Sequence, residues 1–178
     1  RQASDGLKRR ALALLASWPA EGRDAYIVQY SAAANALASS GKPAELQELL
    51  ARYWMTPAGR VAADAAAREA LDTGRPLLAA LYWQDLRETE GGRLAPDARS
   101  FLEESLAWDR AGRIDFRRDL WEITGFPPAG PLVIGGVPLE GNTPRLAAEA
   151  WLAQHAAGRE PRRLLKDWPL FRGDGSRN

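Results

Sequence analysis

The spacing of apolar residues predicts α-helices over most of the chain before Gly125. Apolar side chains recur three and four positions apart, as they do on one face of an α-helix. Glycines and prolines divide this pattern into segments, which predict helices at about 4–18, 43–50, 57–72, 76–88, 96–110 and 113–124. The clearest start is Thr56-Pro57, because the hydroxyl accepts an N-cap hydrogen bond and proline suits the first helical position.

The segment from Ala25 to Tyr30 (AYIVQY) supports two interpretations. Its β-branched and aromatic residues favour a buried strand, whereas the alanine-rich run that follows favours a helix. If the segment is a strand, the chain contains an N-terminal strand–helix unit. If it is helical, residues 23–40 form one helix that Gly41 closes, and the chain is nearly all-α up to Gly125. We take the strand as the working interpretation.

A β-hairpin is predicted between residues 131 and 140. The apolar run Pro131 to Ile134 is followed by Gly135-Gly136, which suits a two-residue turn because glycine tolerates positive φ. Val137 to Glu140 is the predicted return strand. Pro138 donates no backbone hydrogen bond, so this strand is expected at a sheet edge.

A last helix is predicted from Pro144 to about Gly158, since Thr143-Pro144 repeats the N-cap and proline signal. The only histidine of the sequence, His155, falls in its last turn. A metal or catalytic role is not expected for His155, because no clustered carboxylate spacing supplies partners and no Gly-x-Ser-x-Gly motif is present.

The order of elements after Trp121 resembles the C-terminal half of the thioredoxin fold, most closely the DsbC/DsbG/DsbA-like bacterial thiol-disulfide proteins. Residues 121–126 correspond to the end of a helix, Gly130-Pro131 to the family's cis-proline step, and Gly135-Gly136 with Gly141 to the hairpin glycines. The resemblance covers only about residues 114–157. The sequence departs from the family in having no cysteine, and in having Gly130 where the family usually has Thr.

This resemblance implies an α/β fold, a small thioredoxin-like sheet with a large helical insertion at about 56–112. The chain length predicts one domain over 1–157, followed by a tail over 158–178 whose last residues are expected to be disordered. The resemblance also implies a groove for an extended peptide, lined by Tyr30, Ser31, Gly130 and Pro131. A bacterial, periplasmic setting, in an envelope, secretion or conjugation assembly, follows from the resemblance alone; a cytoplasmic location is the alternative.

The tail after Gly158 is short and basic but carries apolar residues, among them Trp168 and Phe171. Such residues are expected to dock on the chain's own domain or on a partner. We therefore add Trp168 and Phe171 to the predicted partner-binding residues.

Composition excludes several classes of function. The formal net charge is +1, so no overall field favours nucleic acid or an anionic membrane. The absence of cysteine excludes redox chemistry through thiols and thiolate metal sites. No apolar run is long enough to span a bilayer. No phosphate-binding glycine motif is present, and no cofactor or metal is expected.

Carboxylates occur in pairs at Glu103-Glu104, Asp115 with Asp119, and Asp85 with Glu88. The neighbouring arginines Arg87, Arg117 and Arg118 favour ordinary ion pairs for these groups, so a hydrolase built on carboxylates is the weakest of three hypotheses. The leading hypothesis is a non-catalytic thioredoxin-like protein that binds a protein partner. The alternative is a mainly α fold with one C-terminal β-hairpin, acting as a helical adaptor or toxin-immunity protein for one protein partner. The oligomeric state is left open.

Overall fold

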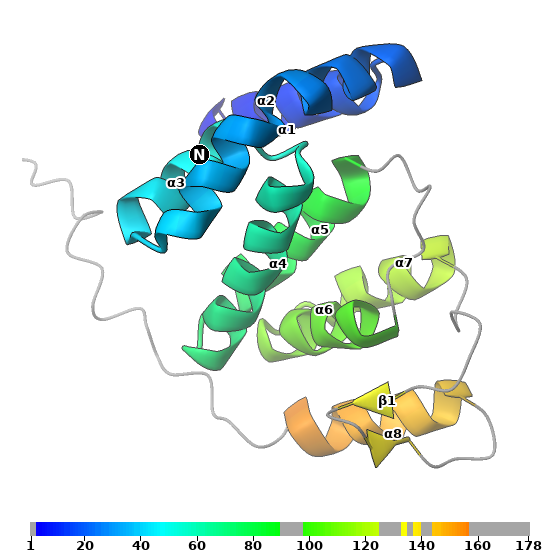
Figure 1. The fold of residues 1–178 in the computed structure, drawn as a ribbon. Coiled ribbons are helices and arrows are strands. Elements are labelled where there is room, and N and C mark those ends of the chain that lie inside the picture. Colours follow the sequence, from blue (N-terminus) through cyan, green and yellow to red (C-terminus); the bar gives the residue numbers. More distant parts are fainter. Residues whose placement is uncertain (1–2, 90–97, 125–132, 135–136, 140–143, 157–178) are drawn as a thin grey trace, which may run out of the picture.

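The structure is a computed structural model that describes residues 3–89, 98–124, 133–134, 137–139 and 144–156. The part of the chain it describes is mainly α, with one short C-terminal hairpin (Figure 1). The elements are α1 (Ala3–Ala16), α2 (Ala20–Ser40), α3 (Pro43–Arg52), α4 (Pro57–Asp72), α5 (Pro76–Thr89), α6 (Ala98–Arg110), α7 (Ile114–Thr124), β1 (Val133–Ile134), β2 (Val137–Pro138) and α8 (Pro144–Ala156). The helices predicted from apolar spacing are confirmed, most of them within two residues.

The helices form three groups along the molecule. The pair α4 and α5 lies in the middle, with α1, α2 and α3 at one end and α6, α7, the hairpin and α8 at the other (Figure 1). The helix α1 packs on α5, and α2 and α3 pack on α4. At the other end α6 contacts α5, α7, α8 and β1, so α6 joins the C-terminal elements to the central pair.

The predicted strand from Ala25 to Tyr30 is wrong, because these residues lie within the 21-residue helix α2. The intrinsic preference of a residue for a strand amounts to about 1 kcal/mol or less, and a strand also needs a neighbouring strand to pair with. Residues 25–30 have no such neighbour, because the only strand pairing in the described residues is β1 with β2. The alanines after Tyr30 continue the helix, and Gly41 ends it in the left-handed conformation (φ 66°).

The predicted resemblance to thioredoxin-like, DsbC/DsbG-like proteins is wrong as well, because it required that strand. The described residues contain no N-terminal strand to join the hairpin, so the α/β fold with a helical insertion is also wrong. The mainly α alternative with one C-terminal hairpin agrees with the structure. The periplasmic expectation had no other basis than this resemblance. No described helix has the combination of length and apolar character that crossing a membrane requires.

The predicted hairpin is present in its central part. Val133 pairs with Pro138 and Ile134 with Val137 in antiparallel register. The predicted Gly135-Gly136 turn lies outside the described residues. The predicted outer residues of both strands, 131–132 and 140, lie outside the described residues. Leu139, just after β2, packs against the main core. The following helix begins at Pro144, as the N-terminal signal predicts.

The main core lies between α4, α5, α6, α7 and α8, and its largest fully buried side chains are Phe101, Leu102, Leu120 and Leu152. Two smaller clusters bury residues of α1, α2 and α3, and Tyr82 and Leu86 pack against both the main core and one of these clusters. Where α4 meets α5 the buried residues are mostly alanines: Ala63, Ala67, Ala70, Ala79 and Ala80. Alanine side chains on this face of α4 let α5 approach closely.

The turn before α4 is fixed by the predicted cap. The Thr56 hydroxyl accepts a hydrogen bond from the Gly59 backbone N–H (3.1 Å) and donates one to the Tyr53 carbonyl (2.7 Å). A Cβ atom on Gly59 would lie 2.0 Å from that same carbonyl oxygen. Only glycine therefore fits at this position with the present backbone.

Several polar groups are buried in the main core and are hydrogen-bonded there. Glu104 is 2% exposed, and its Oε1 accepts from Arg87 (3.2 Å) and from the Trp108 indole (3.3 Å). Burial raises the pKa of the Glu104 carboxyl, and Arg87 and the Trp108 hydrogen bond only partly offset this. The Ser105 hydroxyl accepts from the Trp121 indole (2.8 Å).

The predicted domain limits, 1–157 followed by a tail from 158, stay a prediction, because residues 157–178 lie outside the described residues.

Candidate functional site

The structure places two of the six predicted partner-binding residues. Tyr30 and Ser31 both lie on α2, where Tyr30 is 39% exposed and the Ser31 hydroxyl donates to the Ile27 carbonyl one turn earlier (2.6 Å). Gly130, Pro131, Trp168 and Phe171 lie outside the described residues. The proposed peptide groove depended on a strand at residues 25–30, so that explanation for Tyr30 and Ser31 no longer holds; a partner contact by these residues stays a prediction.

Tyr30 belongs instead to a line of four aromatic side chains, which we call the aromatic row: Trp18, Tyr26, Tyr30 and Tyr53. Neighbouring ring centroids are separated by 6.5 Å for Trp18 and Tyr26, 4.7 Å for Tyr26 and Tyr30, and 5.9 Å for Tyr30 and Tyr53. The row begins just after α1, follows α2 for one turn and ends at the residue that caps α3. It therefore connects three elements on one side of the molecule.

Local geometry holds the row in place. Tyr26 and Tyr30 are four residues apart, so they lie one above the other on α2. The Tyr26 hydroxyl donates to the Arg52 carbonyl at the end of α3 (2.6 Å). Burial, and then the proximity of Tyr30 and Tyr53, raises the pKa of the Tyr26 phenol, so its hydroxyl stays protonated as a donor at neutral pH. At one end of the row, Tyr53 packs against a cluster that contains the completely buried Ala34 and Leu49.

Part of the row is open to solvent. Trp18 is 38% exposed and Tyr30 is 39% exposed, although both are large and mainly apolar. Val28, two residues from each tyrosine of α2, is 81% exposed and points to the opposite side of the helix. The row is thus a fixed, partly exposed aromatic surface, and Val28 provides a comparison on the same helix.

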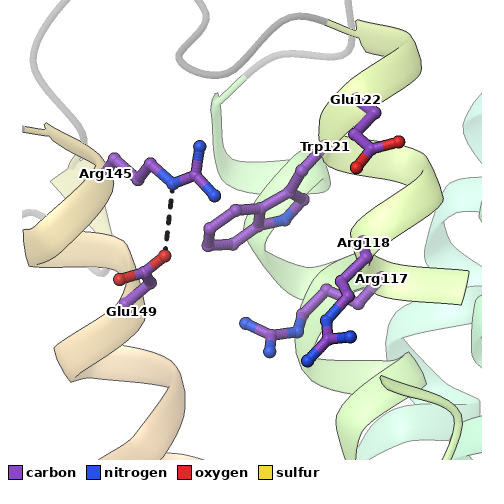
Figure 2. A pocket seen from close by; sticks show the side chains of 6 residues that line it. All are labelled: Arg117, Arg118, Trp121, Glu122, Arg145 and Glu149. Atoms are coloured by element: carbon purple, nitrogen blue, oxygen red, sulfur yellow. Dashed lines mark hydrogen bonds and ion pairs between the residues drawn. The ribbon is translucent and has the colours of Figure 1, made fainter. Parts of the chain in front are cut away.

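A second feature is a pocket of about 470 Å³ between α7 and α8. Figure 2 shows Arg117, Arg118, Trp121 and Glu122 on α7, facing Arg145 and Glu149 on α8. We call it the arginine pocket. Its walls carry three guanidinium groups and two carboxylates around one indole ring.

The three arginines differ in their partners. Arg117 forms an ion pair with Asp109 at the end of α6 (2.8 Å), and both side chains are mostly buried. Arg145 pairs with Glu149 one turn along α8 (3.2 Å), and this pair is largely exposed. Within the part of the chain that the structure describes, Arg118 is exposed and forms no hydrogen bond or ion pair.

Burial raises the pKa of the Asp109 carboxyl, and the Arg117 charge opposes this effect. Burial therefore disfavours the charged form of Asp109, and the short ion pair with Arg117 favours it.

The Trp121 ring forms the apolar part of the pocket. The Arg117 guanidinium carbon lies 5.1 Å from the ring centroid and that of Arg145 lies 5.6 Å from it, within the range of cation–π contacts. Trp121 is only 7% exposed, and its indole N–H is bound to Ser105 in the core. Its position in the pocket is therefore set by core packing.

The remaining candidates for chemistry lie elsewhere. The His155 Nδ1 lies 2.8 Å from the Trp151 carbonyl, and its ring stacks on Trp151 at 4.3 Å. Of the carboxylate pairs, Glu103 is bound by Arg68 and Arg99, whereas Glu104 is buried. Among the described residues no three His, Asp or Glu side chains are grouped as metal ligands would be. The sequence has no cysteine, so it carries no thiol-disulfide redox chemistry.

Sequence reasoning missed the arginine pocket. It assigned Arg117 and Arg118 to ion pairs with nearby carboxylates of the same helix, but Arg117 pairs with Asp109 of α6, and Asp115 pairs with Arg113. The available signal was the position of Arg117 and Arg118 one turn before Trp121, which puts basic and aromatic side chains on adjoining parts of one helix.

We compared the chain with protein-family models, with curated proteins and with solved structures, and no match was found in any of the three comparisons.

Proposed function

We propose that this chain is a mainly helical adaptor that binds one protein partner through the aromatic row. A toxin-neutralising protein would be one form of such an adaptor. The observation that carries the proposal is the row itself, four aromatic rings in continuous contact across three elements, with Trp18 and Tyr30 partly exposed. Tyr and Trp are enriched among the residues that dominate protein–protein binding.

The rigidity of the row supports the same function. Binding costs free energy for each side chain that must be immobilised, so anchors that are already fixed bind more tightly. Tyr26 is tied to α3 by its hydroxyl, and Tyr30 is held between Tyr26 and Tyr53. A partner that covers Trp18 and Tyr30 would therefore lose little affinity to ordering this surface.

The proposal is tested by photo-crosslinking in cells of the source organism. A benzophenone amino acid replaces Tyr30 in one variant and Val28 in another, and both are exposed positions of α2. We expect one discrete adduct from position 30, because that side chain lies in the binding surface. Position 28 is the matched control and should give no such adduct, since it points to the other side of the helix.

The adduct is identified by mass spectrometry and the interaction is then measured with purified proteins. Trp18→Ala should weaken binding by about tenfold or more, as expected for an anchor residue worth over 1 kcal/mol. Equal adducts from positions 28 and 30, or no adduct from position 30, would contradict the assignment of the row as the binding surface.

A further inference from the structure

The arginine pocket holds positive charge that the described residues do not neutralise firmly. Arg118 has no partner among them, and Arg145 is bound only to Glu149 in an exposed pair four residues apart. Such exposed pairs contribute little, so Glu149 is easily displaced from Arg145 by another carboxylate. Arg117, in contrast, is held by Asp109, so its charge is already matched by a mostly buried carboxylate.

The geometry of the pocket resembles a carboxylate-binding site in which the protein's own Glu149 carboxylate already contacts one arginine. In Figure 2 the Arg145 and Glu149 side chains face Trp121, Arg117 and Arg118 across the gap between α8 and α7. Arginine binds carboxylates through two parallel N–H groups, which gives both energy and direction. Glu149 is already paired with Arg145, so a carboxylate from a ligand would compete with Glu149 for this arginine.

Charge and shape together favour one class of ligand. Three arginines and two glutamates line the pocket, and Asp109 pairs with Arg117 behind it, so Arg118 is the lining arginine that has no carboxylate partner among the described residues. Glu122 and Glu149 repel a doubly charged phosphate or a nucleic acid backbone more strongly than a single carboxylate. The Trp121 ring, which is 7% exposed, adds a small apolar surface beside the arginines.

We propose that the arginine pocket binds a single Glu or Asp side chain of an acidic segment in the partner protein, with Arg118 and Arg145 gripping the carboxylate and Trp121 packing beside it. This inference rests on the proposed function, since it supplies the second contact of the same protein partner. The aromatic row binds the partner through apolar contact, and the pocket selects it by charge.

The test uses the full chain labelled with ¹⁵N and a capped peptide of sequence Gly-Leu-Glu-Leu-Gly. The readout is the indole N–H resonance of Trp121, assigned with a Trp121→Phe variant among the seven tryptophans. This N–H is bound to Ser105 behind the pocket, so it reports on the ring directly. We expect a saturable shift with this peptide, and none with the peptide in which Gln replaces Glu.

Two variants should change the affinity in opposite directions. Arg118→Gln should weaken peptide binding by about two- to fivefold, because it removes an exposed charge contact. Glu149→Gln should strengthen binding by a similar factor, because it removes the competing internal carboxylate. Both side chains are at least partly exposed, so thermal unfolding followed by circular dichroism should show that the fold is kept.

Several outcomes would overturn the proposal. These are the absence of a saturable shift, equal binding of the Gln peptide, and no gain in affinity from Glu149→Gln. Tighter binding of inorganic phosphate than of the Glu peptide would assign the pocket to phosphate instead. Peptide binding without a crosslink at position 30 would refute the aromatic row and leave the pocket standing, and a crosslink without peptide binding would do the reverse.

Discussion

Gly59 shows how one missing side chain sets the position of a helix. The Tyr53 carbonyl lies where the Cβ atom of any other residue would be, so α4 begins closer to the preceding turn than a larger residue allows. The sequence predicted the Thr56 cap, because the cap depends on residues next to one another. It gave no sign of this requirement at Gly59, since the shape of the turn brings the carbonyl there.

Replacing Gly59 with alanine should destabilise the protein. The new methyl group would force α4 or the turn to move, and overpacking of this kind costs about 1–3 kcal/mol. The measurement is the free energy of unfolding in urea. Gly22 is a matched control, because it also lies at the third position of its helix and an added Cβ would meet only the Trp18 and Pro19 side chains, at 3.8 Å or more.

Gly22→Ala should leave stability unchanged or raise it by up to about 1 kcal/mol, since alanine restricts the unfolded chain more than glycine does. If Gly59→Ala behaved in the same way as Gly22→Ala, the close approach at Tyr53 would not constrain the fold.

Between elements, the contact of α4 with α5 depends on small side chains. The buried alanines of both helices leave room for the two backbones to approach each other, and Trp83 of α5 reaches across to donate its indole N–H to Asp64 of α4 (2.9 Å). The alanine-rich face was visible in the sequence, because its spacing follows one helix. Which helix would cover it was not, because that depends on packing between distant segments.

Ala67→Leu should therefore weaken this contact. Ala67 is completely buried against α5, and a larger side chain there should reduce the free energy of unfolding by about 1–3 kcal/mol. Ala65→Leu on the exposed side of α4 is the control and should change stability by no more than about 0.5 kcal/mol. Thermal or urea unfolding measures the free energy of unfolding of the two variants. Equal values would mean that the contact between α4 and α5 has room for a larger side chain.

The same distinction between local and distant information explains the error at α2. Its β-branched and aromatic residues were interpreted by local preference, and that preference is smaller than the effect of a missing partner strand. The two paired strands, in contrast, lie where the sequence predicts a hairpin, because that prediction uses only neighbouring residues.

Over the whole molecule, the sequence predicted helical segments but not the environments of their charged residues. Glu103 and Glu104 are neighbours in the chain, yet one lies among arginines near the surface and the other is buried in the main core. The arginine pocket joins residues 117 and 145 from different helices, so spacing along the chain indicates only the α7 side of it. Only the folded arrangement reveals either feature.

The buried Glu104 should make stability depend on pH. Burial raises its pKa in the folded protein above the value of 4.5 for an ordinary glutamate, so the folded state binds this proton more tightly than the unfolded chain does. The contribution of Glu104 to stability is therefore least favourable at neutral pH. It improves as pH falls through the folded pKa, and it levels off below the unfolded value.

Glu104→Gln removes this titration. The stability of the variant relative to the natural protein should therefore fall as pH is lowered from neutral, because the natural carboxyl then gains its proton in the folded state. The measurement is the free energy of unfolding of both proteins in urea at several pH values, and taking the difference cancels the other titrating groups. A gap that stayed constant with pH would mean that burial does not perturb this carboxyl.

Trp121 is shared between the interior of the protein and its surface. Its ring contacts Phe101 and its indole N–H reaches Ser105, while its other side adjoins the arginines. Core mutations that shift Trp121 would consequently distort the proposed carboxylate site, even when every guanidinium remains. If that site binds a partner, some mutations that abolish binding should therefore map to buried residues that contact no ligand.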